Sequence, residues 1–270
     1  EAMPAGAPDP SSRAPGPPTH PAAGSSSKPV SSSASSGTVS ETVTGTVREM
    51  SISNSGIQYE NMWVKNTNQY HDIDIAAELA KQPAAKMKKD GTKQILIYHT
   101  HTTEAFAGSS CPQDYSQHVV AVGEEIKEQL EAAGFGVVHD TTCHDYPSYN
   151  GSYDRSGQTL QRNLEKYHDI QVTLDVHSDA MGTQDGMRIK PTALINGKKA
   201  AQVMIISGCD DDGTLGFPNW EYNPRLAARI QKSPPGTAHH NQDIRLEGKE
   251  YGNQNGAARA ESGPASLRQR

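Results

Sequence analysis

Hydrophobic residues are spread unevenly along the chain, and their pattern divides it into three regions. Residues 1–45 contain almost no large apolar side chain, residues 46–232 alternate between apolar runs and turn formers, and residues 233–270 are polar again. Periodic apolar residues that can build a core occur in the middle region. We therefore expect one folded domain over 46–232, between a disordered linker at 1–45 and a disordered polar tail at 233–270.

The clearest element of the middle region is a strand. Residues 94–98 (QILIY) form a continuous apolar run bounded by Gly91 and by polar residues, which is typical of a buried central strand. Residues 119–133 carry apolar side chains every three and four positions, and this spacing predicts a helix that Gly134 ends. The domain therefore opens with a strand followed by a helix.

Strands and helices continue to alternate along the domain. The pattern predicts a short helix at 73–79, a strand at 135–139, a helix at 157–167 capped by Ser156, a strand at 170–176, two strands at 193–194 and 201–207 around the turn at 196–197, and a helix at 220–232. This alternation predicts an α/β fold, with a mostly parallel mixed sheet flanked by helices.

Composition and charge exclude several classes of protein. The formal net charge is −6 and no stretch is dense in Lys and Arg, so we expect no nucleic-acid binding. The linker is rich in Pro, Ala and Ser, which suits a tether spanning some tens of ångströms. The sequence contains no run of about 18 apolar residues, so we expect neither a signal peptide nor a membrane span within it. Cys111, Cys143 and Cys209 are too widely spaced for a zinc ribbon.

Two of the expected strands end in histidine. His99, His101 and Glu104 follow the strand at 94–98, and His177 follows the strand at 170–176. Functional groups of α/β sheets gather at the carboxyl ends of strands. A catalytic zinc takes three protein ligands and leaves a fourth position for water. We therefore predict a zinc site made by His101, Glu104 and His177, with His99 either replacing His101 or orienting the ligands.

For other polar residues near these strand ends, the sequence allows either a functional or a purely structural role. Asp175 and Asp179 flank His177 and either accept its second ring proton or form turns. Tyr149, Tyr153 and Arg155 lie in a loop rich in hydrogen-bonding groups. Tyr153 and Arg155 are candidates for substrate binding, although the loop equally suits a simple helix start. Three further histidines of the middle region are expected in loops or at the surface: His139, His144 and His168.

Several segments together resemble the stage II sporulation protein P family. They are residues 95–104 (ILIYHTHTTE), 139–147 (HDTTCHDYP), 149–156 (YNGSYDRS), 174–180 (LDVHSDA) and 216–221 (GFPNWE). The resemblance covers residues 46–232 and keeps the order and spacing of these segments. It concerns peptidoglycan hydrolases of endospore-forming bacteria.

The resemblance implies the fold of the zinc N-acetylmuramoyl-L-alanine amidases, which is similar to that of phosphorylase/hydrolase proteins. It implies zinc held by His and Glu side chains, cleavage of the bond between muramic acid and L-alanine, and endopeptidase activity on peptide cross-links. Members are anchored by an N-terminal transmembrane helix, which this chain does not contain, and face the space between mother cell and forespore. Their partners during engulfment are peptidoglycan and the stage II sporulation proteins D and M.

Two departures from the family pattern bear on activity. Ser178 stands where such proteins usually have Arg, which removes a cation beside His177. The family's C-terminal Leu-Ile-Glu-x-Gly segment, whose Glu is the catalytic base or acid, has only a superficial counterpart at residues 244–248, where Glu247 is the candidate. That stretch lacks the apolar run of a buried strand. We therefore expect a sheet that is incomplete at the C-terminus, and weak or absent hydrolysis.

Two other functions stay open. A zinc carboxypeptidase or endopeptidase would use the same ligand spacing for a different bond. A catalytically inactive module that binds peptidoglycan or a partner protein would explain the altered C-terminus.

Overall fold

The computed structural model describes residues 39–52, 56–60, 62–106, 114–195 and 197–232, and the strands at 242–247 and 259–260. The helices are α1 (Ile75–Ala80), α2 (Val119–Ala132), α3 (Ser152–Lys166), α4 (Tyr222–Gln231) and the 3-10 turn η1 (Tyr115–Gln117). Among the described residues, no helix combines the length and apolarity that crossing a bilayer requires.

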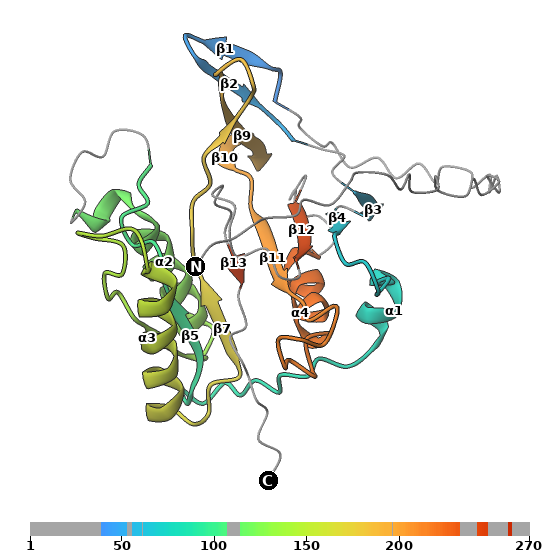
Figure 1. Ribbon diagram of the computed structural model, residues 1–270, viewed down its shortest axis with the longest axis vertical. Coiled ribbons are helices and arrows are strands. Elements are labelled where there is room, and N and C mark those ends of the chain that lie inside the picture. The colour runs from blue at the N-terminus through green and yellow to red at the C-terminus, as the bar shows by residue number, and fades with distance from the viewer. Residues whose placement is uncertain are drawn as a thin grey trace, which may run out of the picture. The chain divides into compact units, whose positions relative to one another are not determined.

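The strands form two sheets (Figure 1). The larger sheet has the order β3-β4-β12-β11-β13-β7-β5-β6, made of β3 (Ile57–Tyr59), β4 (Met62–Asn66), β5 (Lys93–Tyr98), β6 (Gly136–His139), β7 (Val172–Asp175), β11 (Met204–Gly208), β12 (Gln242–Glu247) and β13 (Arg259–Ala260). The smaller sheet has the order β1-β2-β9-β10, with β8 also paired to β9, made of β1 (Thr42–Thr44), β2 (Val47–Met50), β8 (Met181–Gly182), β9 (Arg188–Ile195) and β10 (Lys198–Ala201).

The larger sheet consists of two parallel blocks that run in opposite directions. Strands β7, β5 and β6 are parallel to one another, as are β4, β12, β11 and β13. The blocks meet antiparallel between β13 and β7, and β3 adds antiparallel to β4. The α/β class is therefore confirmed, but the sheet is more evenly mixed than the expected mostly parallel one, because the chain reverses between its two halves.

Most expected elements appear within a few residues of their predicted bounds, and two differ. Helix α3 begins after Gly151, whose φ of +79° suits glycine. Ser156 therefore lies inside the helix, and its predicted role as the N-cap is wrong. The polar residues 152–156 hide this first turn from a search for apolar periodicity. The strand expected at 201–207 is divided, since β10 closes the hairpin with β9 and β11 joins the larger sheet.

Strand β5 is buried between two helices. Ile95 and Ile97 pack with Val119 of α2, whereas Leu96 packs with Leu160 of α3. Because side chains alternate across a strand, α2 and α3 lie against opposite faces of β5 (Figure 1). This packing fixes the carboxyl end of β5, where His99 and the following loop begin.

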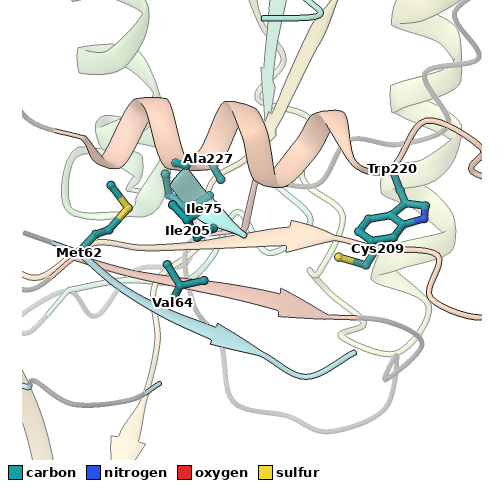
Figure 2. Packing of buried hydrophobic residues seen from close by; sticks show 8 residues of the cluster. Met62, Val64, Ile75, Ile205, Cys209, Trp220 and Ala227 are labelled. Atoms are coloured by element: carbon teal, nitrogen blue, oxygen red, sulfur yellow. The ribbon is translucent and has the colours of Figure 1, made fainter. Parts of the chain in front are cut away.

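A second core lies between α1, α4, β4 and β11 (Figure 2). Its buried residues are Met62, Val64, Ile75, Ile205, Cys209, Trp220, Ala227 and Ala228. A buried ion pair joins the two helices, with Arg225 Nε 2.8 Å from Glu78 Oε2. Burial opposes the ionised form of Glu78, but Lys81 and Arg225 lower the pKa of its carboxyl overall.

The folded region extends beyond the expected bounds at both ends. Strand β1 falls inside the predicted linker 1–45, where the β-branched residues 42–44 pair with β2. Strand β12 falls inside the predicted tail 233–270 and pairs with β4 and β11. The sheet therefore contains a strand in the region where the sequence predicted that one was missing. Ile244 and Leu246 alternate with charged residues, which is the two-residue period of a strand. Residues 1–38 of the predicted linker, residues 233–241, 248–258 and 261–270 of the predicted tail, and Cys111 lie outside the described residues.

The direction of β12 also places the backbone of Glu247. This residue ends β12 in register with Gly208 of β11. Both strands run antiparallel to β7, so their carboxyl ends point toward the amino end of β7. The backbone of Glu247 is therefore directed away from the strand ends that precede His101 and His177.

Candidate metal centre

The three predicted zinc ligands converge at the carboxyl ends of β5 and β7. These strands are parallel neighbours, with Tyr98 in register with Asp175, so the loops that follow them meet at one edge. One ligand atom from each of His101, Glu104 and His177 lies within 4.8 Å of the others. Both imidazoles are buried and the carboxylate is partly buried. The set combines two nitrogen donors with one oxygen donor.

The donor atoms fit a tetrahedral zinc. Glu104 Oε1 and His177 Nδ1 are 3.4 Å apart. Two ligands bound at about 2.0–2.1 Å with tetrahedral angles are separated by roughly 3.3 Å. His101 Nδ1 is buried and has no hydrogen-bond partner, a state that buried polar atoms rarely keep unless an ion or water satisfies them.

Asp175 fixes the ring of His177. His177 Nε2 lies 3.0 Å from Asp175 Oδ1, close enough for an ion pair although not aligned as a hydrogen bond. Asp175 is itself held by Thr100, which donates its backbone N–H at 2.8 Å and its hydroxyl at 2.5 Å. Burial lowers the pKa of His177, but Asp175 and then Glu104 outweigh it and raise the pKa to about 10. Of the two acids weighed in the sequence, Asp175 is thus the one that orients His177.

The segment after β6 secures the loop that carries His101 and Glu104. Asp145 accepts hydrogen bonds from the Thr102 hydroxyl at 2.9 Å and from the Thr103 hydroxyl at 2.7 Å. His144 Nδ1 donates to the carbonyl of His99 at 2.7 Å. His144 lies in a loop, as one of the two expectations had it, but it is only 2% exposed, so the expected surface position is wrong. The ligand loop is thus held by a neighbouring segment as well as by its own strand.

The residues of this site lie within a stretch of the chain that matches a known family. The family model of Stage II sporulation protein P (SpoIIP) matches residues 24–234, which is most of the chain and includes every residue of the triad and its supports. This chain belongs to the stage II sporulation protein P family. The family resemblance drawn from the motifs is therefore confirmed.

One curated relative is the Stage II sporulation protein P of Bacillus subtilis (strain 168). It is 27% identical to this chain, over an alignment that covers 68% of the chain and 50% of the relative. The chain thus spans about half the length of the curated relative it matches. No solved structure matches the chain.

In this member of the stage II sporulation protein P family, the position after His177 contributes through its main chain. Ser178 donates its backbone N–H to Glu104 Oε2 at 2.6 Å. Glu104 therefore keeps Oε1 toward His177 while Oε2 is satisfied. The replacement of the family's usual Arg by Ser178 leaves this contact intact.

Two tyrosines line the other side of His101. The ring of Tyr149 stacks on His101 at 4.5 Å between centroids, with its hydroxyl 3.2 Å from Nε2. Tyr153 meets the same imidazole edge-on at 5.2 Å. Tyr149 is 50% and Tyr153 38% exposed, so both rings also face solvent. Tyr149 was expected in the same hydrogen-bonding loop as Tyr153 and Arg155.

Arg155 holds the segment between β6 and α3 that carries Tyr149. Its guanidinium donates to three backbone carbonyls, those of His144 at 2.6 Å, Ser148 at 2.5 Å and Asn150 at 3.1 Å. These bonds close the segment between β6 and α3 into a fixed shape. The geometry gives Arg155 an architectural part in holding Tyr149.

His99 lies outside the triad. Its Nδ1 contacts the carbonyl of Val176 at 2.9 Å, and its Nε2 contacts His139 Nε2 at 2.9 Å. Burial lowers the pKa of His99 to about 4. Of the two roles considered for His99, the structure favours orientation over ligation. The side chain of His139 is 3% exposed, so the expected surface position is wrong.

Proposed function

We propose that this chain is a zinc-dependent peptidoglycan hydrolase that cleaves the amide bond between N-acetylmuramic acid and L-alanine. The observation that carries the proposal is the convergence of ligand atoms from His101, Glu104 and His177, together with a His101 Nδ1 that is buried without a hydrogen-bond partner. Membership of the stage II sporulation protein P family supports a role in cell-wall hydrolysis during sporulation. The fold of the zinc amidases, and added endopeptidase activity on cross-links, belong to the same proposal.

Each residue of the centre has a distinct task. His101, Glu104 and His177 would hold zinc, and a bound zinc ion would supply Lewis acidity toward the amide carbonyl and water. Asp175 keeps Nε2 of His177 protonated and directs Nδ1 toward Glu104. Asp145 and Thr102 hold the loop in this conformation.

The exposed tyrosines suit a sugar or peptide substrate. Aromatic faces cover the apolar side of a sugar ring and their hydroxyl groups bond polar atoms. Tyr149 and Tyr153 both border His101 and face solvent, so we propose them as the substrate wall. Arg155, the other candidate from the sequence, would act by holding Tyr149 in place.

A catalytically inactive wall-binding module is the second candidate. Among the described residues, the carboxylates of Glu104, Asp145 and Asp175 act electrostatically on His101. All three are engaged, in the ligand set or in hydrogen bonds that hold it. Glu247, the weak candidate for the catalytic base, ends a strand that points away from this edge. General acid–base help is typically worth about 10²–10⁴-fold, so its loss would leave binding with slow hydrolysis.

Digestion of purified peptidoglycan separates these functions. With zinc present, mass spectrometry should detect stem peptides with a free L-alanine amino terminus. Fragments cut only within the peptide would identify a carboxypeptidase or endopeptidase instead. Sedimentation of the protein with the wall and no product would identify the binding module.

The family also suggests where the activity takes place. We propose that the protein works outside the cytoplasmic membrane, between mother cell and forespore, tethered by an N-terminal helix. Stage II sporulation proteins D and M are its proposed partners during engulfment. Co-purification of the full-length protein with each of them from sporulating cells tests this placement.

A further inference from the structure

A row of hydrogen-bonded side chains connects helix α2 to the two ligand-bearing strand ends. Glu124 Oε2 on α2 lies 2.8 Å from His139 Nδ1, at the end of β6. His139 Nε2 lies 2.9 Å from His99 Nε2, and His99 Nδ1 lies 2.9 Å from the Val176 carbonyl. Val176 directly precedes His177, and His99 is two residues before His101. The row therefore ends on the backbone that presents the metal ligands.

The donors of this row can be assigned from its ends. A carbonyl only accepts, so His99 Nδ1 carries the proton that bonds Val176. A carboxylate also only accepts, so His139 Nδ1 donates to Glu124. The contact between the two Nε2 atoms takes one further proton, which we place on His139 Nε2, so that a neutral His99 accepts there. The carboxylate of Glu124 anchors the far side of His139. Removing the His139 donor would leave Nε2 of the buried His99 unsatisfied.

Gly123 makes room for the two imidazoles. A Cβ atom at this position of α2 would lie 2.7 Å from His139 Nε2 and 2.8 Å from His99 Nε2. Glycine inside a helix costs about 1 kcal/mol relative to alanine. Gly157, inside α3, provides a contrast because a Cβ there would meet nothing within 4 Å. The close approach of α2 to the histidine pair thus requires glycine at 123.

We propose that Gly123 and His139 are positioning residues of the metal centre, which act through His99 to hold the Val176 carbonyl and so the main chain that presents His177. This inference rests on the proposed function, because it takes His177 as a zinc ligand. Neither residue would touch substrate. Their contribution would resemble that of other partners behind metal ligands, whose loss typically lowers metal affinity about 10–100-fold.

The substitution Gly123→Ala tests this without removing any polar group. Zinc affinity is measured by competition with a chromophoric chelator, and ligand geometry by the absorption spectrum of the Co²⁺-loaded protein. We expect Gly123→Ala to weaken zinc binding about tenfold or more and to change the Co²⁺ spectrum. The matched control Gly157→Ala, also a helical glycine, should match the parent in both. Equal affinity and an unchanged spectrum for Gly123→Ala would overturn the inference.

A second pair of variants guards against simple destabilisation. His139→Gln keeps an N–H donor near the position of Nε2, whereas His139→Leu removes it. We expect the Gln variant to bind zinc within about threefold of the parent and the Leu variant to lose affinity as Gly123→Ala does. Equal losses in both, with a parent-like Co²⁺ spectrum, would contradict positioning. Failure of the parent itself to bind zinc would refute the proposed metal centre before any variant is compared.

Discussion

Two strand-end loops of this protein have similar residues and different chemistry. The loop after β5 carries His101 and Glu104, while the loop after β11 carries Asp210, Asp211 and Asp212, and Asp211 contacts His71. In the first, the ligand atoms converge and His101 Nδ1 has no partner. In the second, the carboxylates bind the main chain of their own and a neighbouring loop.

The difference shows that acidic and histidine content alone does not make a metal site. Asp210 accepts the N–H groups of Leu215 and Phe217, and Asp211 accepts those of Gln69 and Tyr70. These carboxylates act as turn formers. After β5, other residues provide such support, Asp145 and Thr100 among them, and the ligands are left to face one another.

Removal of a ligand should have the largest effect. His177→Ala should lower zinc affinity by well over the 100-fold that marks the upper range for partners behind a ligand, and should abolish zinc-dependent release of stem peptides. His71→Ala, which removes the histidine that contacts Asp211 of the loop after β11, is the matched control and should bind zinc like the parent. Chelator competition measures both. Similar losses in the two variants would mean that the acidic loop also binds zinc.

Breaking the buried ion pair between Arg225 of α4 and Glu78 of α1 should lower the stability of the fold without changing zinc affinity. Arg225→Met leaves the buried Glu78 carboxylate with Lys81 as its remaining partner among the described residues, and loss of one member of a buried pair costs about 3–5 kcal/mol. Urea unfolding in the presence of chelator measures the change. Zinc affinity should stay within about twofold of the parent, because Arg225 contacts α1 rather than the metal centre. The exposed pair Lys232–Glu60 supplies the control Lys232→Met, with an expected change of about 0–1 kcal/mol.

The ligands could be predicted from the sequence because they follow apolar strands at short spacing. Residues 94–98 marked β5, and the histidines after β5 and β7 marked the edge where the triad forms. The supporting residues could not be found in this way. His139 and His144 act through contacts with His99 that depend on how β6 and its loop pack. Likewise β12 was missed, since its partners β4 and β11 are far away in the chain.

Two buried histidines should give the metal-free protein opposite pH dependences. His99, with its pKa lowered to about 4, destabilises the fold as pH falls below about 6.5, where the unfolded chain takes up a proton first. His177, with its pKa raised to about 10, stabilises the fold below about 6.5, and this contribution is lost as pH rises toward 10. Stability with chelator should therefore decline on both sides of about pH 6.5.

Urea midpoints measured across this pH range check the assignment. His99→Gln should flatten the acid side and His177→Gln the alkaline side. Zinc should flatten the alkaline side of the parent, because ligation requires the neutral imidazole. An alkaline decline that His177→Gln leaves unchanged would assign it to another group.

The smallest effect is expected in the acidic loop, and it sharpens the contrast between the two loops. Asp211→Asn keeps one side-chain oxygen for the N–H groups of Gln69 and Tyr70 but loses the charge beside His71. The side chain is partly exposed to solvent, so the lost bond should cost less than about 1 kcal/mol. Zinc affinity and the Co²⁺ spectrum should be those of the parent, because Asp211 accepts hydrogen bonds from main-chain N–H groups. A weaker zinc affinity in Asp211→Asn, measured beside Asp175→Asn, which should lose about 10–100-fold, would show that this loop binds metal despite its hydrogen bonds.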